Sequence, residues 1–241
     1  MPIDAHLTNL LFVDIETVSA EAAYDDLSDL MKREWNRKAE HIRQREDESY
    51  AELYFERAGI YAEFGKIIVI SVGIFHTLEN GETELRIKCI SGNDEKELLE
   101  NFRETVLKFE QSKLRMCAHN GKEFDFPYLC RRMLVNGIQL PASLDMAGKK
   151  SWEIRHIDTM DMWKFGDYKS YTPLELLAGL FGVEAVYEDS LDGSEVNRTY
   201  HTEKSLDKVA RYCKRNVALL AQVFLHLQSM EPVKKENITV V

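Results

Sequence analysis

The sequence predicts a mixed α/β fold in which helices cover one sheet. Short apolar runs typical of buried strands occur at Leu10–Val13 and Ile67–Phe75. Apolar residues at helical spacing occupy two later stretches, from Leu98 to Phe109 and from Ser205 to about Met230. The chain therefore passes through strands, then a helix, then a further short strand, and this order is typical of a mixed sheet.

Length and composition predict a single domain over residues 1–241. The chain has 241 residues, of which 44% are hydrophobic, and only five prolines, so one large core can account for it. A polar, highly charged stretch at about residues 19–56 is rich in helix formers and predicts a helical insertion after the first strand. Its basic residues alternate with acids, which fits either a solvated helix face or a rim that binds nucleic acid.

The remaining elements are predicted in order along the chain. Strands are expected at Ile67–Phe75, Glu84–Ile90, Arg115–Ala118 and His156–Thr159, the last at a sheet edge, and helices near Asp94, Asp125, Pro173 and Ser205. Residues 231–241 have too little patterning for an element, and we expect a flexible tail there.

The charge and cysteine content limit the classes of function. Asp and Glu total 41 against 31 Lys and Arg, a formal net charge of −10, which argues against a protein that coats duplex DNA through a basic face. The four cysteines are scattered without a C-x-x-C pair, so reduced thiols are expected rather than zinc ligands or disulfides. With no secretory leader and no stretch long enough to span a bilayer, a soluble, cytoplasmic protein without membrane contact is expected.

Two acids follow the first apolar run. Asp14 and Glu16 come directly after Val13, and because strand side chains alternate, both point to one side while Ile15 points back into the protein. Neighbouring carboxylates repel each other unless a cation or a shared proton lies between them. Oxygen ligands favour a hard divalent ion such as Mg²⁺ or Mn²⁺. The alternative is an ordinary strand end with two solvated acids.

A second group of polar residues follows the strand at Arg115–Ala118. Asn120 and Gly121 suit a tight turn, Phe124 can enter the core, and Asp125 begins a helix. Asp125 can be read as a helix cap or as a carboxylate that faces a metal site, and the two readings are compatible.

Aromatic residues crowd the long stretch between residues 136 and 172, at Trp152, Trp163, Phe165, Tyr168 and Tyr171. Such side chains can stack against unpaired bases. They can equally pin a long loop onto the core, and the sequence leaves both interpretations open.

The motifs resemble those of 3′–5′ exonucleases of the DEDD superfamily, which have an RNase H-like fold. The first motif of that superfamily, D-x-E, is present as Asp14 and Glu16. The second is an Asn followed, after two or three intervening residues, by an aromatic residue and Asp, and it is present as Asn120, Phe124 and Asp125.

The third motif indicates the subgroup that carries a tyrosine. The family pattern Y-x-x-x-D appears here with Tyr212 and with Asn216 where the family has its fourth carboxylate; four residues apart, the two project from one helix face. The segments FERAGIYAEFGKIIVISVG, from Phe55, and HIDTMDMWKFGDYKSYTPLELLAG, from His156, also resemble this subgroup. More narrowly, the chain resembles stand-alone proteins related to the proofreading exonuclease domain of family B DNA polymerases.

The resemblance implies a role for each motif residue. Asp14, Glu16 and Asp125 would hold two Mg²⁺ or Mn²⁺ ions, the arrangement that serves phosphodiester hydrolysis in two-metal nucleases. Tyr212 would aim the attacking water, because a phenol with a pKa of about 10 is a poor base at neutral pH. The first candidates for contact with the terminal nucleotide are Thr17, Asn120 and Phe124; their alternative roles are turn formation and packing.

Two functions follow as hypotheses. The first is a metal-dependent 3′–5′ exonuclease that releases nucleoside 5′-monophosphates from single-stranded ends, with DNA favoured over RNA. Its activity would be reduced because Asn216 replaces a carboxylate. The second is a catalytically impaired protein that binds nucleic-acid ends or a partner protein through the same cleft. Retention of Asp14, Glu16, Asp125 and Tyr212 favours the first hypothesis, and Asn216 favours the second.

Overall fold

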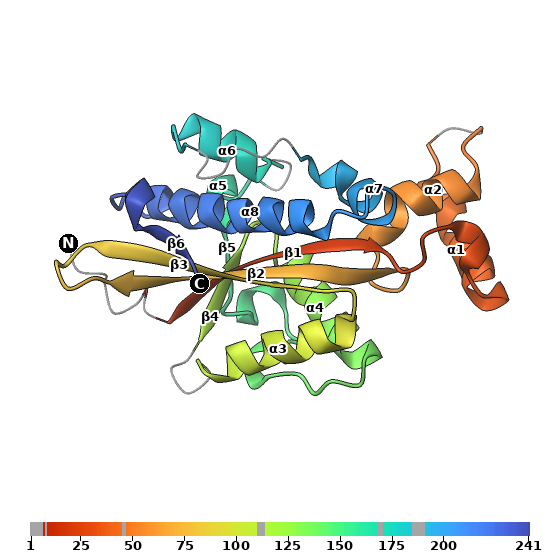
Figure 1. Ribbon diagram of the computed structural model, residues 1–241, viewed down its shortest axis with the longest axis horizontal. Coiled ribbons are helices and arrows are strands. Elements are labelled where there is room, and N and C mark those ends of the chain that lie inside the picture. Colours follow the sequence, from red (N-terminus) through yellow and green to blue (C-terminus); the bar gives the residue numbers. More distant parts are fainter. Residues whose placement is uncertain (1–6, 8, 45–46, 110–113, 168–170, 185–190) are drawn as a thin grey trace.

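A six-stranded mixed sheet forms the centre of the molecule, and helices cover both of its faces (Figure 1). The computed structural model describes residues 7, 9–44, 47–109, 114–167, 171–184 and 191–241. The strands are β1 (Leu10–Ser19), β2 (Gly65–Thr77), β3 (Thr83–Ser91), β4 (Arg115–Ala118), β5 (Ile157–Asp158) and β6 (Ile238–Val240).

The strand order is β5-β4-β1-β2-β3-β6. Strands β1, β2 and β3 pair as an antiparallel meander, whereas β4 runs parallel to β1 and β5 runs parallel to β4. This arrangement confirms the RNase H-like mixed sheet that the sequence predicts. It also places β1, with its two acids, at the centre of the sheet.

Strand β1 is longer than its apolar run. Its pairing with β2 continues as far as Ser19, which lies opposite Gly65, with a bulge between Glu16 and Thr17. The acids therefore lie within the strand and not beyond its end, because the antiparallel partner supplies hydrogen bonds that the local pattern does not reveal. On the other side, β4 pairs only with residues 10–12 of β1, so the edge of β1 beyond Phe12 is free of strand pairing.

The helices form two layers. The longest, α8 (Leu206–Leu227), lies across one face of the sheet, and α3 (Glu95–Leu107) and α4 (Asp125–Val135) lie on the other (Figure 1). The other helices are α1 (Asp29–Ile42), α2 (Tyr50–Arg57), α5 (Thr159–Lys164), α6 (Leu174–Leu180) and α7 (Val196–His201). Short 3₁₀ turns occupy Tyr24–Asp26, Ala58–Ile60, Ala142–Leu144, Ser151–Glu153, Gly193–Glu195 and Lys235–Asn237.

Helix α8 owes its position to its apolar side. Val209, Cys213, Val217, Leu220 and Phe224 recur at intervals of three or four residues and are all buried, so one stripe of the helix packs against the sheet. Helix α3 begins where the sequence predicts, because the Asp94 carboxylate accepts a hydrogen bond from the Glu97 N–H at 3.1 Å.

The predicted helical insertion is confirmed as α1 and α2, which lie at one end of the sheet (Figure 1). Trp35 is fully buried among aromatic rings, with the Tyr54 and Phe64 ring centres at 5.3 and 5.1 Å. The insertion thus has a small core of its own. Its charged residues remain on the outside, as both interpretations of its sequence require.

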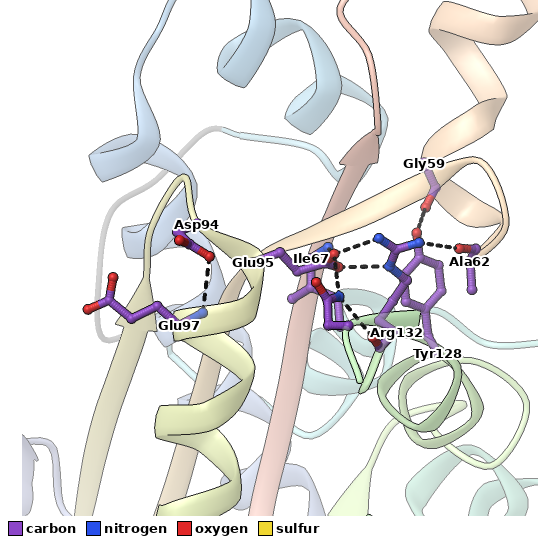
Figure 2. Close-up of polar contacts among 9 residues, drawn as sticks. Gly59, Ala62, Ile67, Asp94, Glu95, Glu97, Tyr128 and Arg132 are labelled. Carbon is purple, nitrogen blue, oxygen red and sulfur yellow. Dashed lines mark hydrogen bonds and ion pairs between the residues drawn. The ribbon is translucent and has the colours of Figure 1, made fainter. Parts of the chain in front are cut away.

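A buried ion-pair cluster joins the segment between α2 and β2 to helices α3 and α4 (Figure 2). The Glu95 carboxylate accepts hydrogen bonds from the Ile67 N–H, from two nitrogens of Arg132 and from the Asn136 amide, at 2.6–2.9 Å. Arg132 also donates to the Ala62 carbonyl at 2.9 Å. The cluster fixes α3 and α4 to the start of β2.

The last residues of the chain differ from the expected flexible tail. Within 231–241, β6 pairs in parallel with β3, and Val233 exchanges two hydrogen bonds with the side-chain amide of Gln222 on α8. Pairing with β3 satisfies the backbone of a segment whose own pattern is too short to predict a strand. None of the helices in the described part of the chain has the length and apolar character needed to cross a membrane.

Candidate active site

The two acids of β1 meet the inner side of α8. One ligand atom each from Asp14, Glu16 and Cys213 lie within 4.8 Å of one another. The Asn216 amide nitrogen lies 3.4 Å from an oxygen of Asp14 and 3.4 Å from an oxygen of Glu16. Cys213 and Asn216 are three residues apart, so both project from the helix toward the strand.

Asp125 joins this group from the other side of β1. It is the first residue of α4 and is 5% exposed. Its Oδ1 accepts a hydrogen bond from the Ile15 N–H at 3.2 Å, on the edge that β4 leaves unpaired. A carboxylate therefore takes the place of a neighbouring strand at this point, and the turn before α4 brings it there.

The three carboxylates are short of positive charge. Burial raises the pKa of Asp14 to about 6, while hydrogen bonds from Cys213 and Asn216 act in the opposite direction. Burial and the charge of Asp14 raise the pKa values of both Glu16 and Asp125 above their usual range. Among the described residues, no Lys, Arg or His forms an ion pair with any of the three.

Tyr212 lies one helical turn before Asn216. Burial and the charge of Glu16 raise its pKa, and a hydrogen bond with Asn216 lowers it. The phenol is therefore protonated at neutral pH and can orient a water but not deprotonate it. Asn216 donates its amide hydrogens toward both acids, so its nitrogen partly offsets their charge in this structure.

A cleft of about 900 Å³ opens beside the cluster. Glu16 and Thr17 line it from β1, and Asn120 and Phe124 line it from the segment before α4. These residues include every predicted nucleotide contact, and the structure brings all of them to one surface. Further lining residues that the sequence interpretation did not select are Phe55, Arg57, His119, Asn197 and Arg198.

The segment that carries Asn120 is held by a buried aspartate. Asp158, which is 3% exposed, accepts hydrogen bonds from the N–H groups of Asn120 and Lys122 at 2.9 and 3.0 Å. Asn120 has a φ of 62°, a left-handed conformation that asparagine tolerates better than most residues. Its carbonyl accepts from the Phe124 N–H at 3.0 Å, which closes the turn that leads into α4.

Of the aromatic residues between residues 136 and 172, some are placed for stacking against bases and others pack onto the core. Tyr171 lines the cleft and is 69% exposed, whereas the Trp163 ring packs edge-on against Phe181 at 5.8 Å. Trp152 and Phe165 are exposed away from the described cleft lining. Tyr168 lies outside the described residues.

Several site residues have no distinct sequence signal. Cys213 lies inside the third motif, but the motif does not specify its type. Arg198 belongs to α7, in a polar stretch that reads as a loop, and Arg57 ends the insertion helix. Only the tertiary arrangement brings these residues to the same cleft. Asp158 carried a signal, since it belongs to the segment from His156 that resembles the exonuclease subgroup.

The donor set of the cluster fits a hard divalent cation. Three carboxylates with raised pKa values, of which Glu16 and Asp125 are buried, supply oxygen ligands and excess negative charge, which a divalent ion would neutralise. The Cys213 sulfur is a softer donor, and its thiol is directed at the Asp14 carbonyl oxygen at 3.3 Å. Asn216 would have to turn its oxygen inward to serve as a ligand.

The fold and the cleft with its carboxylates define an RNase H-like domain. A family model described as "predicted 3′–5′ exonuclease related to the exonuclease domain of PolB" matches residues 60–237, and the chain belongs to this family. No curated protein matches the sequence.

Solved structures also match. One is the family B DNA polymerase from the hyperthermophilic archaeon Pyrobaculum calidifontis, with 16% sequence identity and a TM-score of 0.49. The match covers 92% of this chain and 26% of the polymerase chain, so this protein spans about a quarter of the polymerase's length.

Proposed function

We propose that the protein is a 3′–5′ exonuclease that requires a divalent metal and removes nucleoside 5′-monophosphates from single-stranded ends, with DNA favoured over RNA. The observation that carries the proposal is the convergence of three carboxylates, two of them buried, without a cationic partner among the described residues, beside a cleft of about 900 Å³. Family membership supports the same class of reaction.

The residues have distinct parts in this proposal. Asp14, Glu16 and Asp125 hold Mg²⁺ or Mn²⁺, and Tyr212 orients the attacking water. Two bound cations would generate the hydroxide, stabilise the charge on the phosphoryl oxygens and assist the leaving 3′-oxygen. The ring of Phe124 offers a flat apolar surface to the terminal base.

The cleft walls also favour an anionic, unpaired strand. Thr17 and Asn120 supply hydrogen-bonding groups beside the carboxylates. Arg57 and Arg198 line the same cleft, and both are exposed. Guanidinium groups bind phosphates bidentately, so these two residues are suited to the backbone of the strand beyond its terminal nucleotide.

The direct test is digestion of a 5′-labelled single strand in the presence of Mn²⁺, Mg²⁺ or excess chelator. We expect a ladder of products that shortens from the 3′ end, formed only with metal, and released 5′-mononucleotides. Asp14→Asn, which keeps the side-chain shape, is expected to abolish the ladder. Cleavage that persists in chelator, or digestion from the 5′ end, would contradict the proposal, and an RNA strand of the same sequence tests the preference for DNA.

One observation favours a second candidate, an end-binding protein with impaired catalysis. The Asn216 nitrogen contacts Asp14 and Glu16 at 3.4 Å each, where the family has a carboxylate. If the protein binds single strands but releases no nucleotide at any metal concentration, the end-binding function replaces the exonuclease.

A further inference from the structure

A second cation-bearing hollow lies outside the cleft, beside α7. It has a volume of about 450 Å³ and is lined by Lys66, Asn93, Tyr200, His201, Lys204 and Glu21, among others. We refer to these six residues as the lysine pocket. None of them belongs to the carboxylate cluster or to the cleft lining.

The two lysines have no acidic partner among the described residues. Neither Lys66 nor Lys204 forms an ion pair there, although the nearby Lys208 pairs with Glu203 at 3.6 Å. Burial lowers the pKa of His201, and the nearby ammonium groups of Lys66 and Lys204 lower it further. The pocket therefore concentrates positive charge on a protein with a formal net charge of −10.

The walls of the pocket are held in place by contacts of their own. The Lys66 ammonium lies 5.4 Å from the centre of the Tyr200 ring, and the Tyr200 hydroxyl donates to Asn93 at 3.0 Å. Buried His201 is 9% exposed, and its Nε2 donates to the Ser19 carbonyl at 3.0 Å. The lysine stems therefore project from a surface that is already ordered.

The pocket is connected to the cleft through the end of β1. Ser19 donates from its N–H and from its hydroxyl to the Asn197 side chain, at 2.8 and 3.0 Å. Asn197 lines the cleft, while the Ser19 carbonyl faces His201 of the pocket. Helix α7 contributes to both hollows, since Asn197 and Arg198 line the cleft and Tyr200 and His201 line the pocket.

We propose that the lysine pocket binds a phosphate group. Two ammonium groups in an open hollow suit a compact anion with several oxygens, because lysine binds phosphate as a point charge without a demand for planar geometry. Glu21 is the single acid of the pocket, and it weakens the attraction. Phosphate binding by itself does not depend on the proposed nuclease activity. The source of the phosphate, a nucleotide or a nucleic-acid strand, does rest on that proposed function.

The test is calorimetric titration of the full chain with inorganic phosphate, with 5′-dAMP and with single strands of increasing length, in excess chelator. Chelator prevents the carboxylate cluster from binding phosphate through a metal. We expect Lys66→Ala with Lys204→Ala to weaken phosphate binding by about tenfold or more, the loss of one to two charge-assisted hydrogen bonds. The matched control Lys208→Ala is expected to bind as the wild type does.

Two further variants separate charge from structure. Lys66→Arg with Lys204→Arg keeps the charge and is expected to retain binding, and Glu21→Gln is expected to tighten it. Circular dichroism and thermal melting establish that each variant folds. Unchanged phosphate binding in the alanine variant, or no binding by the wild type at low salt, would overturn the proposal.

The different ligands identify the source of the phosphate. If the alanine variant loses affinity for long strands but not for short ones, the pocket holds the backbone of the bound strand. If it loses affinity only for inorganic phosphate and 5′-dAMP, the pocket takes a free nucleotide. Phosphate binding without nucleotide release in the digestion assay would leave the pocket in place and reject the nuclease.

Discussion

Two groups of acidic side chains differ in how their negative charge is balanced: Glu95, which pairs with Arg132, and the set of Asp14, Glu16 and Asp125. Glu95 accepts four hydrogen bonds, two of them from the Arg132 guanidinium (Figure 2). Asp14, Glu16 and Asp125 have the neutral N–H groups of Ile15 and Asn216 instead. The first cluster is complete and holds the fold together, whereas the second has unmet charge that a ligand can use.

The largest expected effect is a loss of folding stability when the cluster of Glu95 and Arg132 is broken. Arg132→Met leaves Glu95 buried without its cation, and removal of one partner of a buried ion pair costs about 3–5 kcal/mol. The side chains of Arg132 and Glu95 are only 12% and 9% exposed. Urea denaturation measures the loss.

The control is Arg33→Met, whose partner Glu34 is exposed and whose loss is expected to change stability little. Addition of Glu95→Gln to Arg132→Met is expected to restore part of the stability, since the uncompensated charge is then gone. If Arg132→Met lowers the free energy of unfolding by less than about 1 kcal/mol, the pair of Glu95 and Arg132 does not hold the fold together as proposed.

In the cluster of Asp14, Glu16 and Asp125, removal of a charge is expected to raise the stability of the metal-free protein. An acid whose pKa is higher in the folded state than in the unfolded state destabilises the fold at pH values above the folded pKa. That cost is relieved as the pH falls from about 6 toward 4. For Asp14, whose pKa is raised from 3.8 to about 6, the cost at pH 8 is up to about 3 kcal/mol.

We therefore expect Asp14→Asn to raise the stability of the metal-free protein at pH 8 and to have little effect at pH 4, in urea denaturation with chelator. Added Mn²⁺ should stabilise the wild type more than the variant, because only the native wild-type site binds the ion tightly. A variant that is less stable than the wild type at pH 8 in chelator would show that Asp14 is not short of positive charge.

Asn216→Asp is expected to widen the difference in stability between the metal-free and the metal-bound protein. The new carboxylate replaces the only side-chain amide among the described contacts to Asp14 and Glu16, so the metal-free protein should melt at a lower temperature. The metal-induced rise in melting temperature should increase, because an ionised oxygen ligand is gained. Exonuclease activity should rise, or the metal concentration needed for it should fall, across a Mg²⁺ and Mn²⁺ titration.

Asn216→Ser serves as the neutral comparison, since it removes the amide without adding charge. If Asn216→Asp changes neither the melting temperature nor the metal dependence, Asn216 lies outside the functional site.

The smallest effect is expected at the cleft walls. Arg57→Ala and Arg198→Ala should each raise KM for a single strand by a few-fold and leave kcat almost unchanged, since contacts to the backbone contribute to binding and not to the reacting centre. The effect should shrink at high salt. Steady-state digestion measures both constants, and Arg131→Ala, on the exposed side of α4, is the control. A fall in kcat alone would contradict a role in strand binding.

Local patterns predict much of this fold. The apolar runs of β1 and β2, the Asp94 cap of α3 and the stripe of α8 each depend on residues close together in the sequence, and all are confirmed. Strand β6 and helix α7 could not be predicted, because each is short and owes its order to a distant partner.

The same distinction applies to the site. The motif acids were found because their spacing within a strand or helix carries the signal. Their surroundings were not, since the arginines of the cleft reach it only through the placement of the insertion and α7. The extent of β1 past Val13 likewise depends on pairing with the first part of β2, from Gly65 to Ser71, which follows in the chain only after the insertion.

The Ile15 amide donates a hydrogen bond to Asp125, so the exchange rate of this one backbone proton depends on where the Asp125 carboxylate lies. Because β4 ends before this point, the protection of that proton against exchange with solvent depends on a single side chain. Anything that draws the Asp125 oxygen away, such as a cation or a substrate, should speed its exchange with deuterium, while amides within the ladder between β1 and β2 serve as the internal reference. The interior of the sheet would thereby report on events in the cleft without any label at the site itself.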